Sequence, residues 1–233
     1  MSAPGRPGRG SLKRVPFESV LNELDLFIGH AERQIDQIDR RVLQGERIPH
    51  DEKVFSLFQP HTEWIVKGKA GVPVELGLPI CIVEDQFGFI LHHQVMEKTT
   101  DKTIAVAIIT ATQQRFTLGS VSTDKGFHSA ANRRELEKLV GLVVMPKKGR
   151  LSAVDREREA DEEFVRLRHK HSAVESAINA LEAHGLDRCP DDGIVGFKRY
   201  VALAVVARNV QRLGAVLRQQ DAERLRKQYR RAA

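Results

Sequence analysis

A short apolar run over residues 117–123 ends in an aspartate and a glycine, Asp124 and Gly126. The preceding stretch, 102–116, is too long for an ordinary strand, so its apolar pattern predicts a helix. The following stretch, 128–140, predicts another helix, and 142–145 predicts a short strand that Pro146 stops. Alternating helices and strands indicate an α/β layer, in which a strand-end aspartate points to a cleft.

The rest of the pattern adds an antiparallel part and long helices. Apolar steps of three and four predict one or two amphipathic helices from Phe17 to about Gln44. The β-like runs 74–83 and 89–95 flank a turn signal and predict a hairpin. We expect one long helix over 155–184 and a last, buried helix from Gly193 onward. This order fits a mixed α/β fold, with rival α+β arrangements left open.

The charge of the chain is concentrated at its two ends. The net charge is +6, yet residues 1–14 carry four basic side chains and no acid. Residues 208–231 carry eight basic side chains against two acids. Clustered cations suit a polyanion such as nucleic acid, and solvated tails are the plainer alternative.

Cysteine use and hydropathy point to a cytoplasmic protein with no membrane span. Cys81 and Cys189 have neither metal-ligand spacing nor a disulfide framework, so a reducing compartment is expected. The longest apolar stretch, 200–207, has eight residues, against the roughly 20 that a membrane helix needs.

Acidic residues on the long predicted helix suggest a metal cleft together with Asp124. At spacings of 3, 4, 4 and 3, one helix face carries Arg168, His171, Glu175, Asn179 and Glu182. Carboxylates are the ligands that Mg²⁺ prefers, and two such ions about 3.5–4 Å apart can drive phosphoryl transfer. The alternative is that Asp124 caps a turn and Glu175 is a solvated helix acid.

Several sequence blocks resemble the C-terminal half of bacterial insertion-sequence transposases, whose DDE catalytic triad stands on an RNase H-like fold. The resemblance covers roughly residues 35–215. The matching blocks are 40–46, 52–56, 61–65, 67–70, 74–77, 124–129, 171–182, 184–189, 197–203 and 207–209.

The resemblance implies specific roles for some of these residues. Asp124 matches the second catalytic aspartate and Glu175 the glutamate, both as ligands of Mg²⁺, or of Mn²⁺ in its place. Candidates for DNA contact are Lys125, Arg168, His171, Arg208 and Arg212. Where the superfamily often has an arginine before the glutamate and a lysine after it, this chain has His171 and Glu182.

The first aspartate of the triad has no clear counterpart. In such folds it belongs on the first strand, ahead of the hairpin. Asp85 is a doubtful substitute because it falls at the hairpin turn, and Asp101 is expected to be a helix N-cap. We therefore expect a truncated form with an incomplete sheet and weak or no catalysis.

The expected activity is DNA transposition by Mg²⁺-dependent phosphoryl transfer on element-end DNA, and whether this chain is itself an enzyme is left open. The alternatives are a non-catalytic DNA-binding remnant or regulator of an intact transposase, and a decayed product that does not fold stably. Expected partners are double-stranded DNA at the nucleoid and, as an open alternative, further copies of the chain. The expected domains are a disordered basic tail (1–14), an amphipathic helical segment (15–50), a partial RNase H-like catalytic domain (51–217) and a basic helical tail (218–233).

Overall fold

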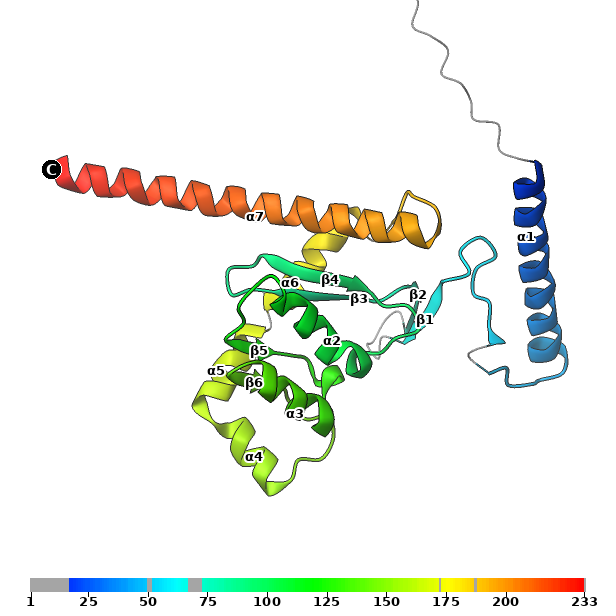
Figure 1. The fold of residues 1–233 in the computed structure, drawn as a ribbon, viewed down its shortest axis with the longest axis horizontal. Coiled ribbons are helices and arrows are strands. Elements are labelled where there is room, and N and C mark those ends of the chain that lie inside the picture. The colour runs from blue at the N-terminus through cyan, green and yellow to red at the C-terminus, as the bar shows by residue number, and fades with distance from the viewer. Residues whose placement is uncertain (1–16, 50–51, 67–72, 172, 187, 233) are drawn as a thin grey trace, which may run out of the picture. The chain divides into compact units, whose positions relative to one another are not determined.

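The computed structural model describes residues 17–49, 52–66, 73–171, 173–186 and 188–232 (Figure 1). The side chains of 171–176, 184 and 230–232 also lie outside the description. The expected tail at 1–14 is therefore outside the described residues. The chain divides into two compact units, the first ending at Thr62 and the second starting at Glu63.

The first unit is built on one amphipathic helix. α1 (Phe17–Ile38) continues into a π-helical turn (Asp39–Leu43), and Gly45 leaves it at a φ of +70°, a conformation that favours glycine. This confirms the helix predicted over 17–44. Arg40 joins the helix to the segment after it, pairing with Glu46 at 2.6 Å and Glu52 at 2.9 Å.

The second unit begins with two antiparallel hairpins. They are β1 (Glu63–Val66) with β2 (Val74–Gly77), and β3 (Ile80–Glu84) with β4 (Ile90–Val95). The hairpin predicted around residues 84–88 is confirmed. The run predicted as one strand over 74–83 is instead two strands in different hairpins, separated by Leu78 and Pro79. Proline lacks the N–H that a ladder needs, which explains the break.

An alternating α/β region follows. Its elements are α2 (Asp101–Gln113), β5 (Ser120–Ser122), a 3₁₀ turn (Lys125–Phe127), α3 (Ala130–Leu139) and β6 (Leu142–Val144). The two helices and two strands match the sequence-based expectations to within three residues, and the 3₁₀ turn was not predicted. β5 and β6 pair in parallel, with Ser122 opposite Val144. α2 packs on both the hairpin β3–β4 and α3, and closes a core around Ile104, Ile108 and Leu136.

The single long helix expected over 155–184 is wrong. The structure has α4 (Ala153–Ala160), α5 (Glu162–His171), α6 (Ala173–Leu181) and a kinked π segment (Glu182–Leu186). The break between α4 and α5 has a local cause, because Asp161 turns away from helical geometry with ψ at 135°. Its Oδ1 then accepts hydrogen bonds from the N–H groups of Glu163 and Phe164, at 3.0 Å each, and starts a new helix.

The last helix, α7 (Gly193–Ala232), runs along the hairpin and extends past it (Figure 1). Val201, Ala204 and Val205 are buried against hairpin residues, whereas Leu203 and Val206 are exposed. The sequence predicted a buried helix, whereas the structure buries only one side of it. Of the described helices, α7 has the length and composition to cross a membrane, which is weak evidence because long core helices meet the same measure.

The architecture is mixed α/β, with antiparallel hairpins preceding a parallel pair and helices flanking both. Within the described residues the strands form three separate two-stranded sheets, not one continuous sheet. This is consistent with the expected incomplete RNase H-like fold, which brings the N-terminus of α2 to the end of β5.

Candidate active site

Asp124 leaves the sheet at the carboxyl end of β5. The N–H of Thr123 donates to the carbonyl of Val144 at 3.0 Å, so the strand remains paired up to the residue before the aspartate. Asp124 is exposed and occupies the N-cap position of the 3₁₀ turn, but its side chain accepts no capping hydrogen bond from that turn. The geometry therefore gives no support to a role as a simple turn cap.

A second carboxylate, that of Asp101, lies beside this turn. A Cβ placed on Gly126 would stand 2.3 Å from Oδ2 of Asp101, so the carboxylate rests against the glycine backbone. Burial raises the pKa of Asp101, and the nearby charge of Asp124 raises it further, whereas Lys148 lowers it. Two acids and a lysine thus act on one another electrostatically at this edge of the fold.

Asp101 is the first residue of α2 and not its N-cap, which corrects the expectation for it. The N-cap is Thr100, and its hydroxyl lies 2.9 Å from that of Thr103. The carboxylate of Asp101 is consequently left to face the turn that follows Asp124.

Asn132 fixes the arrangement of these elements. Its side-chain amide donates to the carbonyl of Lys102 at 2.7 Å and to that of Phe127 at 3.0 Å. The hydroxyl of Ser129 accepts a hydrogen bond from the N–H of the same asparagine and caps α3. One side chain on α3 therefore ties the start of α2 to the turn that carries Lys125, which is exposed directly after Asp124.

Glu175 lies on α6, and its side chain is outside the described residues, as is that of His171 at the end of α5. Arg168 is exposed on α5, which contacts both β5 and β6. The break at Asp161 precedes all of these residues, and residue 172, between α5 and α6, lies outside the described residues, so their shared helix face stays a prediction. Whether Glu175 meets Asp124 stays a prediction.

Asp85 has a structural role in the turn of the hairpin β3–β4. Its Oδ1 accepts hydrogen bonds from the N–H groups of Phe87 at 2.8 Å and Phe89 at 2.9 Å. The turn lies at the end of the hairpin opposite Met96, where the chain leaves for α2. The structure therefore gives Asp85 a local task in holding this turn.

Two of the basic residues predicted to contact DNA lie on α7 near the same turn. Nε of Arg212 donates to the carbonyl of Phe87 at 2.5 Å, so its guanidinium is occupied in joining the helix to the hairpin. Nη1 of Arg208 donates to Oε1 of Gln211 at 3.4 Å. Neither residue belongs to the turn or helix ends that carry Asp124 and Asp101.

The donor set at the strand end suits a hard divalent cation. Asp124 and Asp101 offer carboxylate oxygens. Burial and then the charge of Asp124 raise the pKa of Asp101, and a bound cation would relieve the repulsion between the two carboxylates. Among the side chains that the structure describes, no group of three or more His, Cys, Asp or Glu could hold a metal ion. The side chain of Glu175 is not among them.

Sequence reasoning missed that Asp101 lies beside the turn after Asp124, and that Lys148 acts electrostatically on Asp101. The three residues are far apart in the chain and share no motif or spacing. Only the parallel pairing of β5 with β6 offers a signal, because the carboxyl ends of parallel neighbours lie at the same edge of a sheet.

Comparison with known families gives one match. A family model described as Transposase DDE domain matches residues 45–210, more than two thirds of the chain. No curated protein and no solved structure matches the chain.

Proposed function

The chain belongs to the DDE transposase family, and we propose that it acts on element-end DNA by Mg²⁺-dependent phosphoryl transfer with Asp124 and Glu175 as metal ligands. The observation that carries the proposal is the position of Asp124, whose exposed carboxylate follows β5 and makes no cap to the turn after it. Mn²⁺ has the same oxygen preference and is the expected substitute.

Each part of the site has a definable task in this reaction. When bound, the divalent ions activate the attacking oxygen and stabilise the leaving one. Asp124 supplies a ligand from a rigid strand end, and Glu175 supplies one from α6. Asp101 adds negative charge that favours cation binding, and Asn132 holds the turn in place. Lys125 is positioned next to Asp124 to contact a phosphate oxygen of the DNA.

We propose that this chain alone cleaves DNA weakly or not at all, because none of its residues is assigned as the first catalytic aspartate. Asp85, the doubtful candidate for that position, is engaged in the hairpin turn. Asp124 and Glu175 provide two carboxylates where the family's triad provides three, and two ligands hold a metal pair less firmly.

Metal binding tests the assignment without requiring turnover. At a concentration ten times its Kd, Mg²⁺ would stabilise the fold by about 1.4 kcal/mol, raising Tm by roughly 3–6 °C. This shift is expected to disappear in Asp124→Asn and Glu175→Gln. Asp192→Asn, which removes an exposed acid with no proposed role, is the matched control and should keep it. If neither Mg²⁺ nor Mn²⁺ changes the Tm of the wild-type protein, the proposed metal site is wrong.

Nicking of a supercoiled plasmid in Mn²⁺ tests the catalytic part separately. The proposal expects at most slow nicking, abolished by Asp124→Asn. Efficient cleavage that depended on Asp85 would show that Asp85 serves as the first catalytic aspartate, and would contradict the proposal of weak or absent cleavage.

A second candidate function is DNA binding without catalysis, as a regulator of an intact transposase. The exposed basic side chains near the C-terminal end of α7 favour it, including Arg218, Arg226 and Lys227. If the wild-type protein and Asp124→Asn bind DNA equally well, and metal changes the Tm of neither, this second function is supported over the first.

A further inference from the structure

The loop between β6 and α4 carries a run of basic residues, Lys147, Lys148 and Arg150, beside the candidate active site. β5 and β6 run in parallel and in register, with Ser122 opposite Val144. The two segments that follow these strands therefore leave the sheet at the same edge, about 4.8 Å apart. Asp124 begins the segment after one strand, and Pro146 with Lys147 begins the segment after the other.

Lys147 anchors this loop to the protein. Its Nζ pairs with Oδ2 of Asp155 at 2.5 Å, and its backbone N–H donates to Oε1 of Glu159 at 2.7 Å. Asp155 is nearly buried and also accepts a hydrogen bond from the hydroxyl of Ser152 at 2.6 Å. The ammonium group of Lys147 is thus paired with a nearly buried carboxylate, so this lysine positions the loop and is not one of the cations offered to a ligand.

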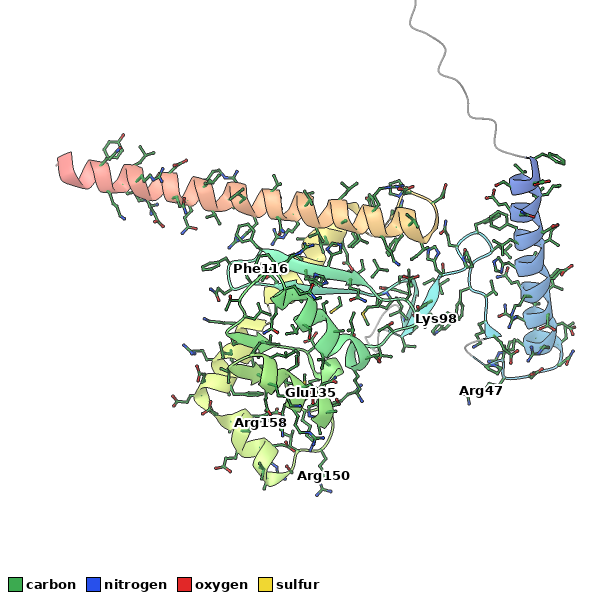
Figure 2. The ribbon with its side chains drawn as sticks, viewed as in Figure 1. Arg47, Lys98, Phe116, Glu135, Arg150 and Arg158 are labelled. Carbon is green, nitrogen blue, oxygen red and sulfur yellow. The ribbon has the colours of Figure 1, made fainter. Side chains whose placement is uncertain are left out.

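The two other cations of the loop are exposed. The chain reverses at Gly149, whose φ is +90°, and both Lys148 and Arg150 have exposed side chains. Figure 2 shows Arg150 extending outward from the loop ahead of α4. Lys148 acts electrostatically on Asp101, and so does Asp124. The loop thus presents the exposed cation of Lys148 to the acidic strand end and that of Arg150 two residues further along the chain.

We propose that the loop 147–150 is a phosphate clamp in which Lys148 and Arg150 hold the DNA backbone next to the phosphate at Asp124. The inference rests on the proposed function, because the strand it holds is the one that the active site acts on. A polyanion that approaches Asp124 and Asp101 meets repulsion, and neighbouring cations on an anchored loop offset it. The contacts go to phosphates, so they carry no sequence preference.

Equilibrium DNA binding tests the clamp. The probe is a fluorescently labelled duplex of arbitrary sequence, titrated with the full chain between about 0.05 and 0.2 M salt. Losing one phosphate contact weakens binding about fivefold at 0.15 M salt, so Lys148→Gln/Arg150→Gln should lose about thirtyfold. The slope of log K against log salt should become shallower by about 1.8.

The control removes the same charge elsewhere. Lys138 and Arg166 are 67% and 63% exposed on α3 and α5, and Lys138→Gln/Arg166→Gln should change the affinity less than twofold. Lys148→Arg/Arg150→Lys keeps both cations and should keep the affinity and the slope. Circular dichroism melting of each variant checks that the fold is intact.

The outcomes separate the two proposals. If the wild-type protein binds DNA and both double Gln variants weaken it equally, the clamp is wrong and the proposed function stands. If the wild-type protein shows no salt-dependent binding, the proposed function fails and the clamp fails with it.

Discussion

The carboxylate of Asp101 lies against the backbone of Gly126, so that a methyl group at residue 126 would stand 2.3 Å from Oδ2 of Asp101. This contact joins the first residue of α2 to the turn that follows Asp124. It explains why a glycine two residues after the aspartate matters structurally: residue 126 has no space for a side chain while Asp101 keeps its place.

Gly126→Ala is predicted to displace the turn that carries Asp124. Overpacking of this kind costs about 1–3 kcal/mol, measurable as a lower urea midpoint. Gly119→Ala is the matched control, because nothing lies within 4 Å of its added methyl group. Adding Asp101→Ala to Gly126→Ala should recover most of the loss. If the double variant were as unstable as Gly126→Ala alone, the contact with Asp101 would not be the cause.

Asp101→Asn is predicted to stabilise the protein at neutral pH. Burial, and then the charge of Asp124, raise the pKa of Asp101, so ionising this carboxyl costs more in the folded than in the unfolded chain. The penalty is absent below the unfolded pKa of about 3.9 and grows as pH rises through the folded value.

Melting temperatures of wild type and Asp101→Asn across pH check this prediction. The variant should melt higher at pH 7 and converge with the wild type in acid. A variant that melts lower at pH 7 would mean that the charge of Asp101 at the start of α2 stabilises the helix by more than burial costs.

Asp155→Asn is predicted to destabilise the protein at neutral pH and to matter little in acid. Hydrogen bonds from Lys147 and from Ser152 hold the pKa of Asp155 well below its usual range. A lowered folded pKa gives stability that is present above the unfolded value of about 3.9 and is lost as pH falls through the folded value.

Thermal melts at neutral and acidic pH measure the effect, with Glu157→Gln on the exposed side of α4 as the control. The deficit of Asp155→Asn should shrink steadily below about pH 4. An equal deficit at every pH would show that the substitution acts through packing instead of charge.

Asn209→Ala is predicted to loosen α7 from the hairpin β3–β4. The Asn209 side chain accepts a hydrogen bond from the N–H of Ile90 and donates one to its carbonyl, both at 2.9 Å. Leaving these backbone groups unpaired costs about 1–3 kcal/mol in urea denaturation.

Arg212→Gln is predicted to lower stability without changing DNA affinity, because Arg212 is occupied by the carbonyl of Phe87. Val210→Ala, on the exposed side of α7, should change neither property. A loss of DNA affinity in Arg212→Gln with an unchanged melting temperature would restore the DNA contact first predicted for it.

Much of the fold could be predicted because its signals are local. The helix over 17–44, the turn at Asp85, and the order α2, β5, α3 and β6 follow from apolar periodicity and from turn or stop residues, which act within a few positions. The same local rules failed over 155–184, where Asp161 both ends one helix and starts the next. Side-chain capping there outweighs a helical pattern that continues through it.

The sequence by itself determined that Asp124 stands at a strand end before a glycine, and that the chain resembles the transposase family. Tertiary structure alone decided which residues surround it. Asp101 lies beside the turn because α2 packs there, and Lys148, in the segment after β6, acts electrostatically on Asp101. Such proximity depends on the burial of Ile104, Ile108 and Leu136 in one core. Burial is a sum over contacts between distant segments, and no spacing along the chain encodes which of their ends will meet.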